Sequence, residues 1–257
     1  MDYLREKVVV ISGASAGIGA ACVKTLLTAG MIVVGLARRH EYILNMKKEL
    51  SPELSKHLFA IRCDVTQERQ VSKAFDWTND KLGGCDILIN NAGIIATAQL
   101  SQKNNTQQIR DTIETNIMGA VFCIREAFHS MRLLKNGNGH IVIVNSVAGH
   151  QVPNLGPDLP SLNIYPATKF ALKAMNEIYR QEFQRNKTQV RVTTVSPGVV
   201  DTDILPIEIQ NIVKPAMPML EAADVADAIL WALSRPANVQ LMSSKGIIDI
   251  KRPEAFS

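Results

Sequence analysis

A tyrosine, a proline and a lysine stand close together in "NIYPATKFAL", residues 163–172. Pro166 is compatible with a helix only in the first turn, where the backbone N–H that it lacks would have no partner. Tyr165 therefore lies at the start of a predicted helix, and Lys169 lies on the same face one turn later. A phenol beside an ammonium group can exchange a proton with a bound oxygen. A lone pair with this spacing is more often a surface tyrosine and a solvated lysine, so the rest of the chain must decide.

Seven short apolar runs alternate with longer segments of helical periodicity. Because the runs lack polar alternation, they predict strands buried on both faces, as in a parallel sheet covered by helices. We therefore expect an α/β fold: one Rossmann-type domain over residues 1–257, with a doubly wound sheet of about seven strands in a three-layer α/β/α sandwich. The predicted strands cover 7–12, 31–37, 58–63, 86–90, 140–145, 190–196 and 246–250. The first predicted helix follows the first strand and ends at Gly30. The other predicted helices cover 40–50, 67–81, 106–133, 165–185 and 222–234.

The first predicted strand leads into "SGASAGIG", in which Gly13, Gly17 and Gly19 are spaced GxxxGxG. The first glycine permits a tight turn, the second lets the backbone approach a pyrophosphate, and the third lets the next helix pack closely. The N-terminus of that helix would direct free N–H groups and its positive dipole end at the phosphates. A glycine-rich turn alone is a weak signal, but its place between a first strand and a helix predicts a dinucleotide site.

The end of the second predicted strand indicates which dinucleotide binds. NAD-binding folds place an acidic residue here to hold the ribose 2′-OH, whereas this chain has Ala37 followed by Arg38 and Arg39. A guanidinium can hold a 2′-phosphate through two hydrogen bonds. The sequence therefore predicts NADP(H), with Arg38 as the main phosphate ligand. The alternative is a pair of solvated arginines.

Two more strand ends carry polar residues that a dinucleotide could use. Asp64, in "CDVT", can accept a hydrogen bond from the adenine amino group, and Asn90, in "NNAG", opens a turn through Gly93 that can line the ribose. Each of these can also be ordinary turn chemistry.

Asn116 and Ser146 complete the set of candidate catalytic residues. Asn116 is a polar residue on the apolar face of the long predicted helix, where it needs a partner. Ser146 follows the fifth predicted strand, at the carboxyl edge of the sheet where such folds bind ligands. In this order and on this scaffold, Asn116, Ser146, Tyr165 and Lys169 form a specific combination.

With its glycine motif, NNAG, Asn, Ser, YxxxK and PG motifs in order, the whole chain resembles a short-chain dehydrogenase/reductase (SDR) of the single-domain type. The resemblance implies a catalytic tetrad of Asn116, Ser146, Tyr165 and Lys169. Ser12 departs from the usual threonine, Ala16 from a basic residue found in many NADP-dependent members, and the interval of 19 positions from Ser146 to Tyr165 is longer than usual. The implied cofactor contacts are Gly13, Ser15, Gly17, Ile18, Gly19, Arg38, Arg39, Asp64, Val65, Asn91, Ala92, Gly93, Tyr165, Lys169, Pro197, Gly198 and Val200, with Thr202 bonding the nicotinamide carboxamide.

Reduction of a carbonyl requires a hydride on carbon and a proton on oxygen. Tyr165 would donate the proton, and we expect Lys169⁺ and the oxidised nicotinamide to lower its pKa from about 10. Ser146 would bond the substrate oxygen and stabilise the charge that develops there. Asn116 would hold a water that links Lys169 to solvent.

The predicted substrate-binding elements are mostly apolar. Residues 203–220, with "ILPIEIQNIVKPAMPML", would form a mobile lid over the nicotinamide, which suggests a lipophilic alcohol or its ketone or aldehyde. The alternative is that this segment is core or a subunit contact. We place Ser146, Tyr165 and His150 at the substrate, although His150 could equally be a rim residue without a role. The chain resembles an SDR branch with farnesol dehydrogenases and 17β-hydroxysteroid/dicarbonyl reductases, which implies prenyl alcohols, steroids or dicarbonyls.

Composition argues against several other functions. A net charge of +4 with only 5% aromatic residues does not predict nucleic-acid binding. No signal peptide or apolar run of membrane-spanning length is present, so we expect a cytoplasmic protein. No metal site is expected, because the cysteines lack zinc-like or disulfide-like spacing; we expect buried free thiols at Cys22, Cys63, Cys85 and Cys123.

Two functions and two assembly states stay open. The first function is an NADP(H)-dependent oxidoreductase, and the alternative is a non-catalytic NADP(H)-sensing binding protein on the same fold. The resemblance implies a homodimer or homotetramer through the helices of 106–133 and 165–185, which are more apolar than one covered face requires. The alternative is a monomer with a thick core.

Overall fold

A parallel sheet forms the centre of the molecule in a computed structural model that describes residues 2–134, 137–156, 159–216, 218–236, 239 and 247–250. The strand order is β3-β2-β1-β4-β5-β6-β7, which confirms the predicted doubly wound α/β fold. All seven strands begin and end within one residue of their predicted boundaries. Their bounds are Val8–Ser12 (β1), Ile32–Ala37 (β2), Leu58–Arg62 (β3), Ile87–Asn90 (β4), His140–Val144 (β5), Arg191–Pro197 (β6) and Ile247–Ile250 (β7).

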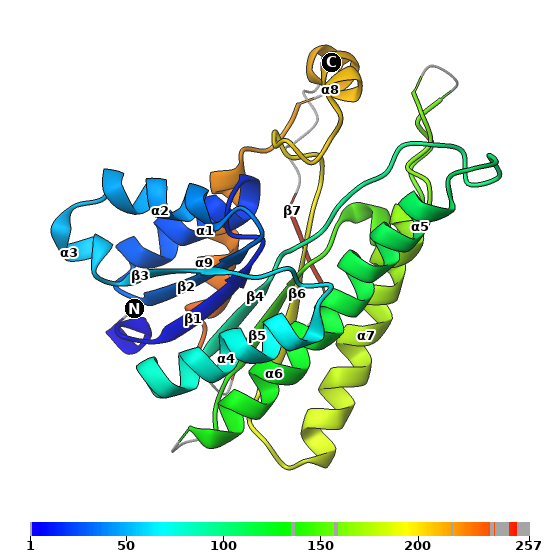
Figure 1. The fold of residues 1–257 in the computed structure, drawn as a ribbon. Coiled ribbons are helices and arrows are strands. Elements are labelled where there is room, and N and C mark those ends of the chain that lie inside the picture. The colour runs from blue at the N-terminus through cyan, green and yellow to red at the C-terminus, as the bar shows by residue number, and fades with distance from the viewer. Residues whose placement is uncertain are drawn as a thin grey trace.

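Helices cover both faces of the sheet (Figure 1). One face carries α1 (Gly17–Thr28), α2 (His40–Glu49) and α9 (Ala222–Leu233), and the other carries α4 (Glu68–Leu82), α6 (Gly119–Leu133) and α7 (Tyr165–Arg185). Each helix connects two parallel strands as a crossover, which gives the three predicted layers. The remaining described helices are α3 (Pro52–Ser55), α5 (Thr106–Ile113), α8 (Ile207–Ala216) and the short turns η1 (Asp2–Leu4), η2 (Glu114–Met118) and η3 (Val147–Gly149).

The order of the strands determines where a ligand can bind. β1 pairs with β2 on one side and with β4 on the other, so the chain reverses its direction of winding beside β1. At such a reversal the connections on the two sides leave in opposite directions and open a crevice at the carboxyl ends of the strands. Figure 1 shows α8 above this edge of the sheet.

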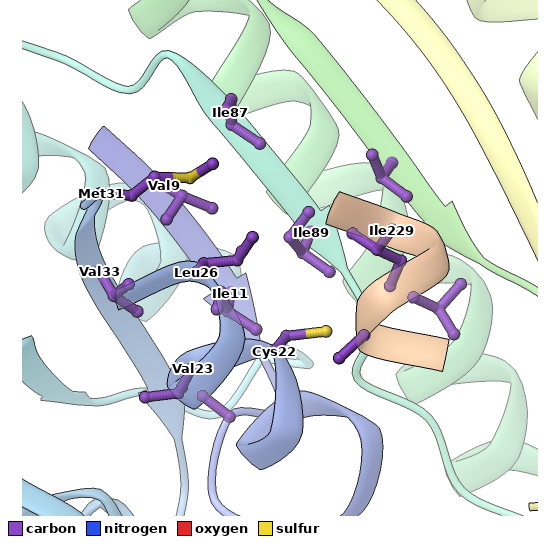
Figure 2. Close-up of a cluster of buried hydrophobic side chains, with 14 of the residues drawn as sticks. Val9, Ile11, Cys22, Val23, Leu26, Met31, Val33, Ile87, Ile89 and Ile229 are labelled. Atoms are coloured by element: carbon purple, nitrogen blue, oxygen red, sulfur yellow. The ribbon is translucent and has the colours of Figure 1, made fainter. Parts of the chain in front are cut away.

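Two apolar clusters, one on each face, hold the helices to the sheet. Strands β1, β2, β4 and β5 are buried along almost their whole length, as expected for strands covered on both faces. Val71 of α4 and Ile124 of α6 belong to one cluster. The four cysteines are buried free thiols, as predicted. Figure 2 shows side chains of the other cluster, among them Val9, Ile11, Cys22, Val23, Leu26, Met31, Val33, Ile87, Ile89 and Ile229.

Two segments differ from the helices that the sequence predicts. The expected continuous helix over 106–133 is interrupted at Glu114–Met118 by a turn of π-helix, which separates α5 from α6. Residues 203–220 were expected as a proline-containing lid and contain α8. In the described part of the chain, no helix has the length and apolar character needed to cross a membrane.

Candidate active site

A cavity of about 960 Å³ opens at the edge of the sheet where β1 to β6 end. Its walls come from the turns after these strands, from the first turns of α1 and α7, and from α8. Of the residues predicted to contact cofactor or substrate, Gly19 and Asn90 do not line it. The predicted residues on its walls are Gly13, Ser15, Gly17, Ile18, Arg38, Arg39, Asp64, Val65, Asn91, Ala92, Gly93, Ser146, His150, Tyr165, Lys169, Pro197, Gly198, Val200 and Thr202.

The glycine-rich turn has the geometry that the motif predicts. Gly13 has a φ of +69°, in the left-handed region that favours glycine. Gly19 lies beneath the cavity wall, where a β-carbon would overlap the carbonyl oxygen of Gly13. Helix α1 begins at Gly17, and its N-cap residue, Ala16, provides no side-chain hydrogen bond. The first N–H groups of α1 thus lack a side-chain cap at the cavity wall, which is the arrangement that binds phosphate.

Ser12 joins the glycine-rich turn to the NNAG turn. Its Oγ accepts hydrogen bonds of 3.0 Å from the backbone N–H groups of both Asn91 and Ala92. The Asn91 side chain donates in return to the carbonyl oxygens of Ser12 and Gly13. Residue 12 therefore joins the two turns through its hydroxyl, which serine provides as well as threonine. Asn90, which we expected beside the ribose, is instead buried as the last residue of β4, and the cavity wall begins at Asn91.

Arg38 and Arg39 follow β2 and line the cavity at its exposed end. Within the described part of the chain, neither guanidinium makes an ion pair with a carboxylate. Arg39 lies over the ring of Tyr42, with 5.0 Å between the guanidinium carbon and the ring centroid. Among the described residues Arg38 makes no such ring contact, so no described side chain competes with an anionic ligand for its guanidinium.

Asp64 performs turn chemistry at the end of β3. Its Oδ1 accepts hydrogen bonds from the backbone N–H of Thr66 at 3.0 Å and from the Thr66 hydroxyl at 2.8 Å. Asp64 also lines the cavity, as does Val65. The turn and a ligand contact are therefore compatible, since one carboxylate oxygen is sufficient for the turn.

Tyr165 and Lys169 lie together on the cavity wall, and both are buried, at 7% and 5% exposure. Tyr165 is the first residue of α7, and Pro166 follows in the first turn, as predicted. The Lys169 Nζ lies 5.5 Å from the centroid of the Tyr165 ring and donates a 3.0 Å hydrogen bond to the Val144 carbonyl oxygen. The interpretation as a surface tyrosine and a solvated lysine is therefore wrong.

Burial determines the ionisation of this pair. It raises the pKa of Tyr165 to about 12, although a hydrogen bond with the Ser146 side chain acts in the opposite direction. It also lowers the pKa of Lys169 to about 8. In the protein without cofactor the phenol pKa is thus raised, because removing the phenolate from water outweighs the hydrogen bond with Ser146. The lowering expected from Lys169⁺ and the oxidised nicotinamide together stays a prediction. At pH 7 Tyr165 holds its proton, and Lys169 is mostly protonated.

Ser146 connects the phenol to the end of β5. It is the N-cap of η3, where its Oγ accepts a 3.1 Å hydrogen bond from the backbone N–H of Ala148. The same hydroxyl hydrogen-bonds the Tyr165 side chain. Ser146 and Tyr165 therefore direct two hydroxyl groups at one point of the cavity, where a substrate oxygen can bind both.

Asn116 is buried in the π-helical turn and lies behind the cavity wall. Its Nδ2 donates to the Ile94 carbonyl oxygen at 3.0 Å and to the Thr168 Oγ1 at 3.1 Å, and its Oδ1 accepts from the Ile94 N–H at 2.8 Å. Thr168 in turn donates to the carbonyl oxygen of Tyr165. Asn116 thus fastens the irregular segment after β4 to the first turn of α7. The π-helical turn at this residue is the irregularity that often marks a functional site.

The cavity has an apolar half that the sequence predicted only in part, through the apolar segment 203–220. Ile94 and Ile95 follow the NNAG turn, while Leu205, Ile209 and Val213 come from α8 and the residues before it. No periodic pattern marks these positions, since most of them lie in turns that only the folded chain brings together. The apolar residues contributed by the long segment before α7 are Val147, Pro153, Leu155, Leu159 and Leu162.

Among the described residues, no group of three or more His, Cys, Asp or Glu side chains could hold a metal ion.

Comparisons with known proteins agree with this geometry. The family model "short chain dehydrogenase" matches residues 7–211. A farnesol dehydrogenase of Aedes aegypti is 42% identical over 241 residues, covering 94% of this chain and 95% of that protein. Dehydrogenase/reductase SDR family member 11 of Homo sapiens is 34% identical, covering 94% of each. A short-chain type dehydrogenase/reductase from Mycobacterium marinum superposes with a TM-score of 0.81 at 26% identity, covering 96% of this chain and 94% of that one.

The cavity, the ordered motifs and these relatives lead to one conclusion: the chain belongs to the short-chain dehydrogenase/reductase family of NAD(P)(H)-dependent oxidoreductases.

Proposed function

We propose that the protein is an NADP(H)-dependent oxidoreductase that interconverts a lipophilic alcohol and its aldehyde or ketone. The observation that carries this proposal is the convergence of the Ser146 and Tyr165 hydroxyls, with Lys169 beside them, on a cavity whose far half is apolar. One part of the site can transfer a proton to or from an oxygen, and the other can enclose hydrocarbon.

Several residues fit a nicotinamide dinucleotide phosphate. The uncapped N-terminus of α1 fits the pyrophosphate, and the guanidinium of Arg38, which pairs with no carboxylate in the described ranges, fits a 2′-phosphate at the end of β2. Thr202 lies against the glycine turn, since a β-carbon on Gly17 would be 3.0 Å from its Cγ2. Pro197, Gly198, Val200 and Thr202 would bound the nicotinamide end. A solved structure of ElxO, at 25% identity and a TM-score of 0.80, has NADP bound. When bound, the cofactor supplies or accepts the hydride.

The residues of this chain handle the proton. In the direction of reduction, the Tyr165 phenol donates its proton to the substrate oxygen, while the Ser146 hydroxyl stabilises the charge on that oxygen by a hydrogen bond. Lys169, held by the Val144 carbonyl, provides a positive charge beside the phenolate that results. Asn116 acts as a positioning residue, because its amide is already bonded to Ile94 and Thr168. A water that links Lys169 to solvent would then lie against the segment after β4, which Asn116 holds in place.

The apolar half of the cavity supports a hydrophobic substrate. The inner face of α8 contributes Ile209 and Val213, at 3% and 6% exposure, and the segment before α7 contributes Leu155 and Leu159. The similar Aedes aegypti protein is named a farnesol dehydrogenase. We therefore place prenyl alcohols such as farnesol first, before steroids and dicarbonyls. Residues 203–220 would act as the lid, with α8 as its rigid part.

The thiols support the proposal of a cytoplasmic location, and the surface of α7 supports the proposal of an oligomer. The four buried, free cysteines agree with the reducing cytosol. Phe170 and Ile178 expose 39% and 50% on α7, so we propose that this helix packs against a second subunit in a homodimer or homotetramer. Sedimentation of the protein as a monomer at micromolar concentration would contradict this assembly.

Turnover tests the function directly. We expect the protein to oxidise NADPH with farnesal, or with a steroid ketone or dicarbonyl, and to reduce NADP⁺ with the matching alcohol. Tyr165→Phe should lower kcat on the order of 10²- to 10⁴-fold because the proton donor is lost, and NADPH affinity should change little. The matched control is Tyr179→Phe, which removes a phenol from the same helix outside the cavity and should keep kcat. Tight NADPH binding without turnover on any substrate would instead favour an NADP(H)-sensing binding protein.

Cofactor preference tests the role of Arg38. Arg38→Asp should lower kcat/KM with NADPH by about 10- to 100-fold, the loss of a charge-assisted contact of roughly 1.5–3 kcal/mol. It should leave or improve kcat/KM with NADH, because a carboxylate can hold the ribose 2′-OH. Arg185→Asp, on an exposed arginine at the far end of α7, makes the same change in net charge. An equal effect of both substitutions would contradict a specific phosphate contact.

The two faces of α8 test the lid. Ile209 faces the cavity, whereas Ile212 is 44% exposed and does not line it. Ile209→Ala should raise KM for farnesal by roughly tenfold, since it removes buried apolar contact, and should affect a small carbonyl substrate less. Ile212→Ala should leave both KM values near those of the unsubstituted protein. If Ile209→Ala raises KM equally for large and small substrates, α8 does not contact the substrate chain.

A further inference from the structure

A hydrogen bond between two side chains joins the η3 turn, which lines the cavity after β5, to the neighbouring strand β6. The Nε2 of His150 lies 3.1 Å from the Oγ of Ser196, which is 46 residues away in the chain. Which of the two atoms donates depends on the tautomer of the imidazole. Ser196 is fully buried and does not line the cavity, whereas His150 does.

One end of this bond belongs to the catalytic serine. Ser146 is the N-cap of η3, and His150 is the C-cap of the same short turn, with its N–H bonded to the Val147 carbonyl oxygen. A turn of three residues is short and locally hydrogen-bonded, so the position of His150 constrains the position of Ser146.

The other end belongs to the predicted nicotinamide wall. Ser196 lies in β6 directly before Pro197 and Gly198, which line the cavity. A residue whose side chain is anchored here constrains the backbone of the two residues that follow it.

The backbone ladder between β5 and β6 ends just before these walls. Its last register pair is Val144 with Val195, and the Asn145 N–H then donates to the Val195 carbonyl oxygen at 2.8 Å. Beyond this point the chain of β5 turns into η3 while β6 continues to Pro197. The bond between His150 and Ser196 therefore spans the two walls where the β5–β6 ladder has ended.

We propose that His150 and Ser196 form a positioning pair that holds the Ser146 hydroxyl at a fixed distance from the nicotinamide wall. The inference rests on the proposed oxidoreductase function and gives His150 a role different from direct substrate contact. The hydroxyls must meet the substrate oxygen while the substrate carbon meets the cofactor. A displacement of 1 Å between such groups can cost about 10²-fold in rate. Loss of the pair should therefore lower kcat more than it raises KM.

A double-mutant cycle measures whether the two side chains act as one unit. The variants are Ser196→Ala, His150→Phe and the double substitution, each assayed for kcat, KM and Kd for NADPH. Ser196→Ala is the cleaner single substitution, because it removes a hydroxyl without changing the cavity surface. We expect each single variant to lower kcat about tenfold, which corresponds to about 1.4 kcal/mol, with KM and Kd within about twofold. The double variant should be no slower than the slower single variant.

Two further variants separate positioning from stability. His150→Gln supplies a side-chain amide that can reach the place of Nε2 and hydrogen-bond Ser196. It should recover at least half of the kcat that His150→Phe loses. Thr193→Val is the matched control. The Thr193 Oγ1 of β6 makes a 2.8 Å contact with the Nε2 of buried His140 in β5, and neither residue lines the cavity. This control should lower the thermal midpoint and leave kcat unchanged.

The fluorescence of bound NADPH gives a readout that needs no turnover. Emission from the reduced nicotinamide depends on how well the ring is shielded from water, so each single variant should reduce the enhancement seen on binding, and the double variant should reduce it no further. A kcat loss in the double variant equal to the product of the single losses would overturn the pair, as would unchanged kcat in Ser196→Ala. If the unsubstituted protein turns over no substrate, the proposed function fails, and additive or absent fluorescence changes would overturn the pair independently.

Discussion

The site depends on a buried ammonium group. The Lys169 side chain is 5% exposed and lies against the Val144 carbonyl oxygen, and its pKa falls to about 8 from 10.5. A shift of this size represents roughly 3 kcal/mol of preference against the charged form. A protein gains no stability from such an arrangement, so the rest of the fold must hold it in place. What the arrangement provides is a positive charge within reach of a phenol that is itself buried.

The sheet and the helices hold this charge by independent contacts. β5 ends at the carbonyl oxygen that receives the Lys169 hydrogen bond, and α7 starts with Tyr165. Asn116 ties the first turn of α7 to Ile94 after β4, and Ser12 ties the glycine turn to Asn91. The candidate catalytic groups thus come from elements that are themselves fastened to neighbouring strands, and apolar residues line the cavity beside them. Rigid elements with a second layer of hydrogen bonds are what an active site requires to keep its geometry.

Local patterns sufficed for the elements and for most residues of the cavity wall around the predicted cofactor site. Apolar runs predicted the strands, and Pro166 predicted the start of α7. Asn90 was misplaced because the sequence does not show whether the last strand residue or the first turn residue faces the crevice. The π-helical turn at Glu114–Met118 was missed because Ile109, Ile113 and Ile117 continue the helical spacing through it. Helix α8 was missed because the prolines in its segment favour irregular structure. The raised pKa of Tyr165 could not be foreseen, since burial is a property of the whole fold.

The difference absorbance of the unsubstituted protein minus Tyr165→Phe, titrated through alkaline pH with and without saturating NADP⁺, tests the buried phenol most directly. In the protein alone, the phenol should stay protonated beyond pH 10, in agreement with a pKa of about 12. With NADP⁺ bound, the positive ring should lower this pKa, and ionisation should appear at clearly lower pH. A phenol that titrates near pH 10 in both states would show that Tyr165 is in contact with water and separate from the cofactor. That result would contradict the proton-transfer role.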